Sequence, residues 1–515
     1  MTRVEMYRRF RAHAGPWDLI VAGGGATGAG VAIDAASRGY DVLLLEQDDF
    51  GKGTSSRSTK LVHGGVRYLE QGNVSLVMEA LKERGLLLRN APHLVRNLGF
   101  VVPNYDWWEA PFYGIGLKLY NLLAGKYGFG ASRILSREET LERLPTIKPD
   151  GLRGGVIYFD GQFDDSRLLI NLVATAFEQG ATLLNYARVT ELTKDGEGFV
   201  DGVRFRDLET GEECEVRAKV VINATGPFAD ALRRQADPAV EAMIAPSQGI
   251  HLVFDASFLS AEHAIMVPHT SDGRVMFAIP WHGHTLVGTT DTPIAGPSLE
   301  PAPLAQEIEF ILQTSALYLA KKPERADIRS VFAGIRPLVR SGEGGNTAAL
   351  SRDHTIRIEN SGMITVCGGK WTTYRHMAED CVNQAATLAR LPDRPCVTEH
   401  LNIHGFHPAS EKFGRLWMYG SDAPLVEQAA AGEPLDAELP YSAAEVVWAV
   451  REEMARTVED VLARRTRALF LNSRAALRMA PRVAHLMAGE LKQDGAWEAA
   501  QLESFRHTAR NYLPG

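Results

Sequence analysis

A glycine-rich turn near the start of the chain is the feature that most constrains its fold. Residues 18–22 form a short apolar run, and Gly23-Gly-Gly-Ala-Thr-Gly28 follows it directly. The apolar residues 31–37 after the turn predict a helix, and Asp41–Leu45 predicts a second buried strand. A strand, a glycine turn, a helix and a strand within about 30 residues are typical of the first unit of a doubly wound parallel sheet.

The spacing of the glycines indicates that this turn binds a dinucleotide. Gly23 permits a tight turn, Gly25 lets the backbone approach a pyrophosphate, and Gly28 lets the helix pack close to the strand. Glu46 ends the second strand, where an acidic side chain holds ribose hydroxyls and disfavours the 2′-phosphate of NADP. Because the chain carries a single fingerprint at its extreme N-terminus, FAD is favoured over NAD.

The length and composition of the chain narrow the classes of protein to which it can belong. Its 515 residues exceed what one small hydrophobic core can organise and predict two or three domains. The formal net charge of −8 argues against a nucleic-acid-binding protein, which needs a basic surface. The four cysteines show no metal-ligand spacing, so we expect no metal site. No run of about 18 apolar residues occurs, and any membrane contact is therefore expected to be peripheral.

Further strands predict how the fold continues. Val189–Thr193, Val200–Arg206 and Val216–Ile222 are predicted strands of a meander. The meander ends in Asn223-Ala-Thr-Gly226, which is typical of the second glycine turn of a flavoprotein. From Gly249 to Asp291, alternating strands separated by turns predict an antiparallel sheet for a substrate domain.

These patterns predict an α/β fold with three parts. We expect an FAD-binding, Rossmann-like doubly wound domain, a substrate-binding domain on an antiparallel sheet, and a C-terminal helical cap domain. Residues 1–390 hold the first two, which are interleaved. The predicted boundaries are about 15–100, 150–245 and 330–390 for the FAD-binding domain, about 100–150 and 245–330 for the substrate-binding domain, and 391–515 for the helical domain.

Six motifs resemble those of the FAD-dependent glycerol-3-phosphate dehydrogenases and occur in the same order. The resemblance covers roughly residues 15 to 390 and is looser in the helical tail. The broader relationship is to flavoproteins with the D-amino-acid-oxidase-like fold. The six motifs are Ala22–Gly30, Gly53–Tyr68, Asn223–Pro227, Gly288–Asp291, Gly334–Leu338 and Gly368–Arg375.

The resemblance implies an enzyme that oxidises sn-glycerol 3-phosphate to dihydroxyacetone phosphate by hydride transfer to FAD N5. It implies that the electrons pass to a membrane quinone, without saying which quinone. It also implies a cytoplasmic protein attached peripherally to the lipid surface of the inner membrane, and it leaves a homodimer open. The segment Ile115–Ala124, which follows several aromatic residues, suits an interfacial helix. A helix packed on the core is the alternative interpretation.

The predicted substrate contacts are cationic, because the phosphate of this substrate is a dianion. Arg336 stands in a Gly-Ile-Arg-Pro turn, and Arg67 and Lys370 stand in turns bounded by glycine. By the resemblance, these three residues and Tyr68 contact the substrate, and Arg336 and Lys370 also take part in catalysis. The alternative for Arg336 is a structural ion pair.

Oxidation also requires a base for the hydroxyl proton, and two histidines are candidates. His63 and His251 both stand in the shared motifs, and each can instead have a structural or flavin-contacting role. His251 is in addition a predicted substrate contact. Lys370 precedes a helix predicted from about Thr372 to Leu388, whose positive N-terminal end would stabilise a reduced, anionic flavin.

The predicted FAD contacts come from several separate parts of the chain. They are Gly23, Gly25, Ala26, Thr27, Gly28 and Glu46; Thr54, Ser55, Ser56, Thr59, Lys60, Leu61, His63, Gly64 and Gly65; Ala224, Thr225, Gly226 and Asp291; and Gly369, Lys370, Trp371 and Thr372.

Three other functions compete with the quinone-linked dehydrogenase. A glycerol-3-phosphate oxidase uses the same site and gives hydrogen peroxide. An amine or amino-acid oxidase shares the fold, but its carboxylate substrate does not need several cations around one anion. A non-catalytic flavin-binding sensor has no need of a phosphate pocket.

Overall fold

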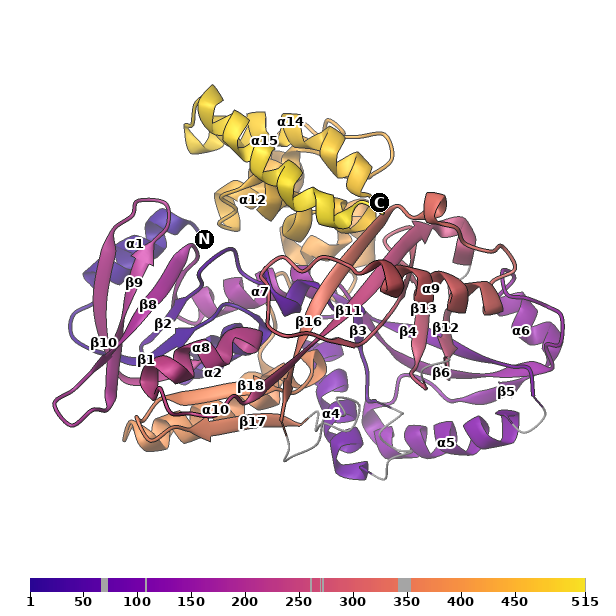
Figure 1. Ribbon diagram of the computed structural model, residues 1–515, viewed down its shortest axis with the longest axis horizontal. Helices are drawn as coiled ribbons and strands as arrows, with labels where there is room; N and C mark the ends of the chain where they lie inside the picture. The colour runs from indigo at the N-terminus through magenta and orange to yellow at the C-terminus, as the bar shows by residue number, and fades with distance from the viewer. Residues whose placement is uncertain are drawn as a thin grey trace.

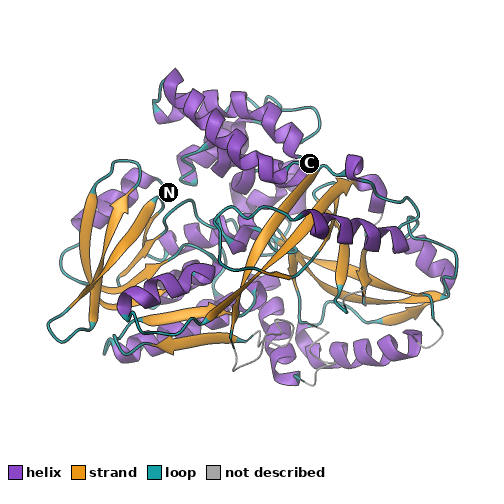
Figure 2. Ribbon diagram, in the orientation of Figure 1, coloured by secondary structure: helices purple, strands orange, loops and turns teal. Residues whose placement is uncertain are grey.

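The structure is a computed structural model that describes residues 1–65, 73–106, 109–259, 262–268, 270, 273–340 and 353–514. Two β-sheets lie beside each other, and helices from the C-terminal part lie above them in the view of Figure 1. Figure 2 shows these C-terminal elements as helices joined by loops. The α/β architecture with a helical C-terminal region that the sequence predicts is therefore confirmed.

The first sheet is built around β1, in which residues 19–22 are fully buried. β1 pairs in parallel with β2 and β10, and β10 pairs in parallel with β18. Parallel strands are covered on both faces, so β1 from Leu19 to Ala22 and the whole of β2 are apolar and do not alternate with polar residues. In sheet order the strands are β17 (His354–Ile358), β18 (Ile364–Gly368), β10 (Glu213–Asn223), β1 (Trp17–Ala22), β2 (Val42–Leu45) and β7 (Thr182–Leu184), and β8 (Ala187–Lys194) and β9 (Val200–Asp207) extend from β10.

The helix after the glycine turn packs tightly between two others. A Cβ atom at Gly30 would lie 3.0 Å from the ring of Tyr374, so α2 and α10 approach each other closely. α7 packs against another side of α2. The helices associated with this sheet are α1 (Arg3–Ala12), α2 (Ala26–Ser37), α7 (Asp165–Glu178), α8 (Ala229–Ala236) and α10 (Tyr374–Leu388).

The second sheet is mainly antiparallel, as predicted. One of its two longest pairings joins β11 and β16, from Ile244 opposite Val339 to Val253 opposite Ser330. β12 and β4 form a parallel pair within it. Its strands are β15 (Thr292–Pro293), β11 (Ile244–Asp255), β14 (His284–Gly288), β13 (Met276–Trp281), β12 (Ala264–Val267), β4 (Val95–Asn104), β6 (Gly154–Phe163) and β3 (Leu61–Val62), with β16 (Ser330–Val339) on β11 and β5 (Arg133–Leu135) on β6. Its helices are α4 (Val74–Asn90), α5 (Glu109–Ala124), α6 (Arg137–Arg143) and α9 (Ala305–Tyr318).

The C-terminal helices share a hydrophobic core with the second sheet. The ring of Phe470 lies 4.8 Å from that of Phe332 on β16, and both rings are buried. Trp281 at the end of β13 belongs to the same cluster of buried residues. These helices are α11 (Ala423–Ala429), α12 (Ala443–Glu452), the π-helix η10 (Asp460–Arg465), α13 (Ala468–Leu471), α14 (Ser473–Leu491), α15 (Gly495–Ala509) and the 3-10 helix η11 (Arg510–Tyr512).

The predicted local elements agree with the structure in type. The meander is present as β8, β9 and β10, and the long helix predicted from about Thr372 is α10, which follows the 3-10 helix η7 (Trp371–Thr373). Strands β6 and β16 pair within the second sheet, and the residue boundaries of the two interleaved domains stay a prediction. Among the described residues, no helix is both long and apolar enough to cross a membrane.

Candidate functional site

A cavity of about 300 Å³ lies where the parallel strands of the first sheet end. Its wall includes the carboxyl ends of β1, β2, β10 and β18 and the first turn of α2. This is the position at which open α/β sheets bind ligands, because loops diverge there. We call it the cofactor cavity, and its lining includes Ala22, Gly23, Gly25, Ala26, Thr27, Glu46, Thr54, Ser55, Ala224, Thr225, Gly226, Gly369, Lys370 and Trp371.

The first and third glycines of the turn are required by close backbone contacts. A Cβ atom at Gly23, where φ is +108°, would lie 2.6 Å from the carbonyl oxygen of Ala224. A Cβ atom at Gly28 would lie 1.9 Å from the carbonyl oxygen of Gly23. The middle glycine differs, since a Cβ atom at Gly25 would meet only the hydroxyl of Ser55 within 4 Å, at 3.1 Å. The backbone at Gly25 is therefore open towards a ligand, as its predicted role requires.

The cofactor cavity combines a helix N-terminus with one carboxylate. Gly25 caps α2 without a side-chain hydrogen bond, and the backbone N–H of Ala26 donates to Ser55 Oγ at 2.9 Å. The other end of the turn holds Glu46, which accepts hydrogen bonds from the backbone N–H groups of Gly24 at 2.6 Å and Asp48 at 2.9 Å. Burial raises the pKa of Glu46 to about 7, although both N–H groups favour the charged form.

A second cavity, of about 320 Å³, opens between the two sheets. Arg336, Arg274 and His251 lie in its wall together with Asp291. Figure 1 shows that β11 and β16, which carry two of these side chains, run from the second sheet towards the first. We call this space the substrate cavity.

Two arginines of the substrate cavity, Arg336 and Arg274, are fixed by the segment that follows β14. Arg336 donates to Asp291 Oδ1 at 3.1 Å, to Thr289 Oγ1 at 3.1 Å and to the carbonyl oxygen of Thr290 at 3.0 Å. Arg274 donates to the carbonyl oxygen of Asp291 at 2.6 Å. Two guanidinium groups with one carboxylate between them give this wall an excess of positive charge, which suits an anionic ligand.

His251 is held as a neutral imidazole in the same wall. Its Nε2 lies 2.9 Å from Thr59 Oγ1, and its ring stacks on Phe332 at 4.9 Å. Burial lowers its pKa far below the usual value, and the charges of Lys60 and Arg336 lower it further. A neutral imidazole is the form that is able to accept a proton.

The two cavities meet at one point in the molecule. Thr54, Lys370 and Trp371 line both of them. The indole N–H of Trp371 donates to the carbonyl oxygen of Ser55 at 2.9 Å, which joins η7 to the segment after β2. A long ligand with its nucleotide end in the cofactor cavity therefore reaches the substrate cavity at this junction.

The remaining predicted residues fall into three groups. Thr59, Leu61, His63, Gly65 and Thr372 lie in the substrate cavity with His251, Arg336 and Asp291, while Gly28, Ser56, Lys60 and Gly64 line neither cavity. Lys60 is fully buried and donates from Nζ to both carboxylate oxygens of Asp165, at 2.9 and 2.8 Å. Arg67 and Tyr68 lie outside the described residues. No cluster of His, Cys, Asp or Glu in the described part of the chain is arranged to hold a metal ion.

Sequence reasoning missed several residues of these walls. In the cofactor cavity they are Lys52, Arg188 and Gln235, and in the substrate cavity they are Arg57 and Arg274. Lys52 directly precedes a recognised motif, and Arg274 directly follows the predicted turn at 271–273, so both had a local signal. Arg188 and Gln235 come from β8 and α8, and no local pattern marks them.

Comparisons with known proteins agree with this architecture. The family of FAD-dependent oxidoreductases matches residues 18–378, and the C-terminal domain of alpha-glycerophosphate oxidase matches residues 368–500. The mitochondrial glycerol-3-phosphate dehydrogenase of Homo sapiens is 41% identical over 536 residues, which cover 96% of this chain and 73% of that protein. The mitochondrial enzyme of that name from Arabidopsis thaliana is 41% identical over 95% of this chain and 85% of its own length.

Solved structures give the same result. The glycerol-3-phosphate dehydrogenase of Bacillus halodurans, solved in complex with FAD, superposes with a TM-score of 0.81 at 30% identity, over 99% of this chain and 97% of that one. L-alpha-glycerophosphate oxidase from Mycoplasma pneumoniae, at 17% identity and a TM-score of 0.59 over 76% of this chain, shares the fold.

Proposed function

The chain belongs to the FAD-dependent glycerol-3-phosphate dehydrogenases, and on this premise we propose that it oxidises sn-glycerol 3-phosphate to dihydroxyacetone phosphate. The observation that carries the proposal is the junction of the two cavities. One cavity has the features of a dinucleotide site, and the other, which shares Thr54, Lys370 and Trp371 with it, presents Arg336, Arg274 and a neutral histidine.

FAD is the cofactor, and the cofactor cavity fits it. The N-terminus of α2 faces the space where a pyrophosphate would lie, with the open backbone of Gly25 beside it. Glu46 is placed to accept hydrogen bonds from ribose hydroxyls. When bound, FAD supplies the acceptor for the hydride that leaves C2 of the substrate.

Arg336 and Arg274 are the groups that we propose for the phosphate of the substrate. Arginine matches phosphate geometry, and both guanidinium groups are already oriented by Thr290 and Asp291, so little side-chain entropy is lost on binding. Lys370, at the junction, is the proposed cation near the reacting atoms. Arg67 and Tyr68 remain predicted contacts.

The substrate hydroxyl must lose a proton as the hydride leaves. His251 and His63 both line the substrate cavity, and each remains a candidate base. The ring of His251 is fixed by Thr59 and Phe332, but the lowering of its pKa by burial and by Lys60 and Arg336 makes it a weaker proton acceptor than an ordinary imidazole. Replacing each histidine by asparagine and recording the pH dependence of kcat/KM distinguishes them, since the loss of the base removes the acidic limb.

We propose a membrane quinone as the electron acceptor and α5 as part of the lipid-facing surface. On α5, Leu117 and Tyr120 are buried, whereas Leu119 and Leu122 are 45% and 76% exposed. Val74 and Met78 on the neighbouring α4 are also exposed. One face of α5 thus packs on the core, and the other has the apolar surface of an interfacial helix. A location on the inner membrane and a homodimer are further proposals.

Anaerobic reduction of the flavin tests this function. We expect addition of sn-glycerol 3-phosphate to the yellow protein to bleach the flavin band within the mixing time of the experiment. A soluble quinone should then restore the band much faster than air. Restoration by air at the same rate, with hydrogen peroxide, would instead show an oxidase. A flavin band that the substrate does not change would exclude the proposed reaction.

A further inference from the structure

One loop forms part of both cavity walls. It runs from residue 47 to residue 60, and we call it the cofactor loop. Residues 51–55 line the cofactor cavity, residues 57–59 line the substrate cavity, and Thr54 lines both. The position of this loop therefore affects the cofactor and the substrate together.

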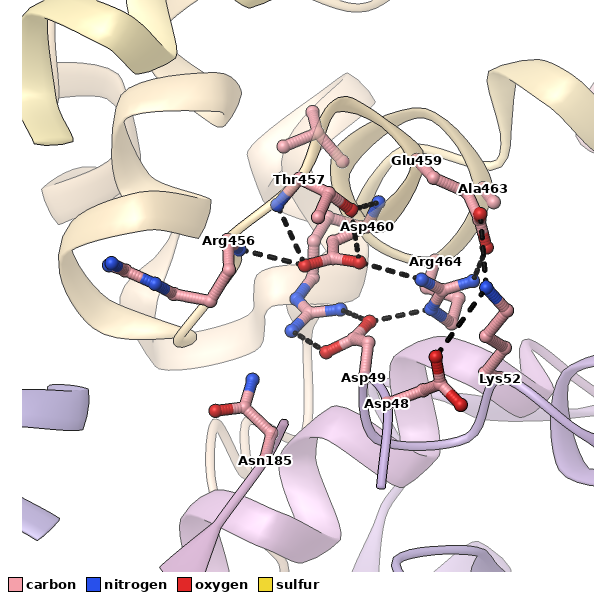
Figure 3. Close-up of polar contacts among 12 residues, drawn as sticks. Asp48, Asp49, Lys52, Asn185, Arg456, Thr457, Glu459, Asp460, Ala463 and Arg464 are labelled. Atoms are coloured by element: carbon pink, nitrogen blue, oxygen red, sulfur yellow. Dashed lines mark hydrogen bonds and ion pairs between the residues drawn. The ribbon is translucent and has the colours of Figure 1, made fainter. Parts of the chain in front are cut away.

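The outer side of the cofactor loop is held by charged residues of the π-helix η10 (Figure 3). Asp49 is fully buried, and its Oδ2 accepts from Arg464 Nε at 2.5 Å and from Arg465 Nη1 at 2.7 Å. Burial raises the pKa of Asp49, but the charges of Arg465 and Arg464 outweigh burial and lower it, so the group is a carboxylate. A buried ion pair of this kind tolerates little displacement, because moving either partner leaves an uncompensated charge.

The shape of η10 explains how two successive arginines reach one carboxylate. The backbone N–H of Thr466 donates to the carbonyl oxygen of Val461 at 2.9 Å, a hydrogen bond that spans five residues. A π-helix turns less per residue than an α-helix, so two successive side chains point in more similar directions. Such turns are frequent at functional sites. Arg464 also donates to Asp460 at 2.7 Å, so each charge of this cluster has a partner.

A second contact of η10 and its flank reaches the cofactor cavity itself. Lys52, which lines that cavity, donates from Nζ to Glu459 Oε2 at 3.2 Å. Glu459 Oε1 accepts from Arg464 at 2.9 Å, so this carboxylate separates two cations. Burial raises the pKa of Glu459, but Arg464 and Lys52 outweigh burial and lower it to about 2. Without this negative charge, Lys52 and Arg464 would repel each other across a buried space.

The C-terminal helices hold the far end of the cofactor loop as well. Arg57 donates to Glu300 at 2.8 Å, and the hydroxyl of Tyr512 in η11 donates to the same carboxylate oxygen at 3.1 Å. The ammonium group of Lys60 lies 5.1 Å from the ring of Phe470 in α13. The loop is therefore held along its length by elements that lie more than 400 residues later in the chain.

We propose that Glu459 is a positioning residue for cofactor binding, and that the C-terminal helices keep the cofactor loop in the shape that binds FAD. In this arrangement Glu459 holds the ammonium group of Lys52, and so fixes a residue of the cofactor loop that lines the cofactor cavity. The inference rests on FAD as the cofactor and is independent of which substrate the enzyme oxidises.

Titration of the apoprotein with FAD tests the role of Glu459. We expect Glu459→Gln to weaken FAD binding about tenfold, measured by flavin fluorescence. The matched control is Glu490→Gln, which removes a carboxylate on α14 from a surface ion pair with Arg451 on α12, away from the loop. We expect this control to bind FAD like the unchanged protein. Unchanged affinity in Glu459→Gln, or an equal loss in both variants, would overturn the proposal.

A double-mutant cycle separates positioning from a general loss of structure. If Glu459 acts through Lys52, adding Glu459→Gln to Lys52→Met should change the dissociation constant of FAD less than about twofold. Fully additive effects would contradict the proposal. Circular dichroism of each apoprotein checks folding, and Glu459→Asp, which keeps the charge at a shorter reach, gives the same comparison if Glu459→Gln does not fold. Since FAD binding alone is measured, failure here differs from failure of the flavin to be reduced by substrate.

Discussion

The two cavities are built from different parts of the polypeptide. The cofactor cavity is defined mainly by backbone. At Gly23 and Gly28 the glycine turn lies so close to neighbouring backbone that a Cβ atom would not fit. The substrate cavity is defined by side chains, since Arg336, Arg274 and His251 project into it from strands or their flanks. The comparison shows that steric changes should damage the first cavity, whereas changes of charge should damage the second.

The largest expected effect is on the charge of the substrate cavity. Arg336→Ala removes a guanidinium that three acceptors hold in place, and we expect kcat/KM for sn-glycerol 3-phosphate to fall about 1,000-fold. The content of bound FAD should stay unchanged, as measured by the ratio of absorbance at 450 and 280 nm. Arg329→Ala, directly before the first residue of β16 and partly exposed, is the control that should stay active. Loss of FAD from Arg336→Ala would break the distinction between the cavities.

A steric change in the wall of the cofactor cavity should instead weaken the binding of FAD. In Gly23→Ala the new methyl group would meet the carbonyl oxygen of Ala224 at 2.6 Å with the backbone at positive φ, and we expect FAD affinity to fall about 100-fold. Gly53→Ala also lies in the cofactor cavity, but a Cβ atom there meets nothing within 4 Å, so it should retain FAD. Equal losses in the two variants, measured by apoprotein titration, would show that crowding of the backbone is not the cause.

A smaller effect is expected at the second arginine of the substrate cavity. Arg274→Ala leaves Arg336 and its partners in place, so we expect KM to rise about tenfold with little change in kcat. Arg274→Lys keeps the charge and should show a smaller increase. Steady-state kinetics with a soluble quinone as acceptor measure both. A KM equal to that of the unchanged enzyme would remove Arg274 from the phosphate site.

The titration of Glu46 in the cofactor cavity gives a test of the comparison through pH. The pKa of Glu46 is raised to about 7 by burial, so the fraction present as carboxylate falls as the pH falls from 8 to 6. A carboxylate accepts ribose hydroxyls better than a protonated acid, and we expect FAD affinity of the apoprotein to fall threefold to tenfold, roughly, across this window. Glu46→Gln should bind FAD weakly with no such pH dependence. An identical pH profile in this variant would assign the effect to another group.

The smallest expected effect is on the stability of the fold, at a residue away from both cavities, and it shows how far a change of stability alone affects FAD binding. His404 bonds to Asp422 at 2.7 Å and to Glu178 at 2.6 Å; burial lowers its pKa, but these carboxylates raise it to about 10. Its stabilising contribution is therefore complete below about pH 6.5 and is lost as the pH rises through about 10. After allowance for partial exposure, we expect about 1 kcal/mol, seen as a lower Tm at pH 9.5 than at pH 6.

The variant His404→Gln should have a lower Tm at pH 6 and a weaker dependence of Tm on pH. Its FAD content and its kcat should not change, because His404 lies in neither cavity wall. A loss of FAD from this variant would mean that global stability, and not the local cavity wall, controls cofactor binding.

The difference between a cavity defined by backbone and one defined by side chains also explains how much of each site the sequence predicts. The glycine spacing encodes backbone geometry directly, so the first sheet, its turn and Glu46 are predictable from residues 18–46 alone. Arg336 was found through a motif resemblance, and nothing local indicates that the antiparallel pairing would place Arg274 beside it, 62 positions earlier in the chain. Side-chain walls depend on strand register, which a linear pattern does not give.

Lys60 shows that a local motif can also suggest a site residue that the structure places in neither cavity wall. It stands in a basic segment that resembles a cofactor-contacting motif, but its partner Asp165 lies 105 residues away at the start of α7. Burial with that partner takes the ammonium group out of both cavity walls. The helical structure of the C-terminal part is predictable from its composition. Its ion pairs with the cofactor loop are not predictable in this way, because they join residues that are distant in the sequence.

The contact between Asp49 and Arg465 also has a consequence for the order of events during protein synthesis. The two residues are 416 positions apart. A ribosome that adds about 5–20 residues per second needs roughly 20–80 s to cover that distance. For that time the nascent chain carries the complete glycine turn while the arginines behind the cofactor loop do not yet exist. If the C-terminal helices support the cofactor loop as proposed, cofactor loading at full affinity is a late, nearly post-translational step, and a chain that ends before residue 459 would carry the turn without the support behind its loop.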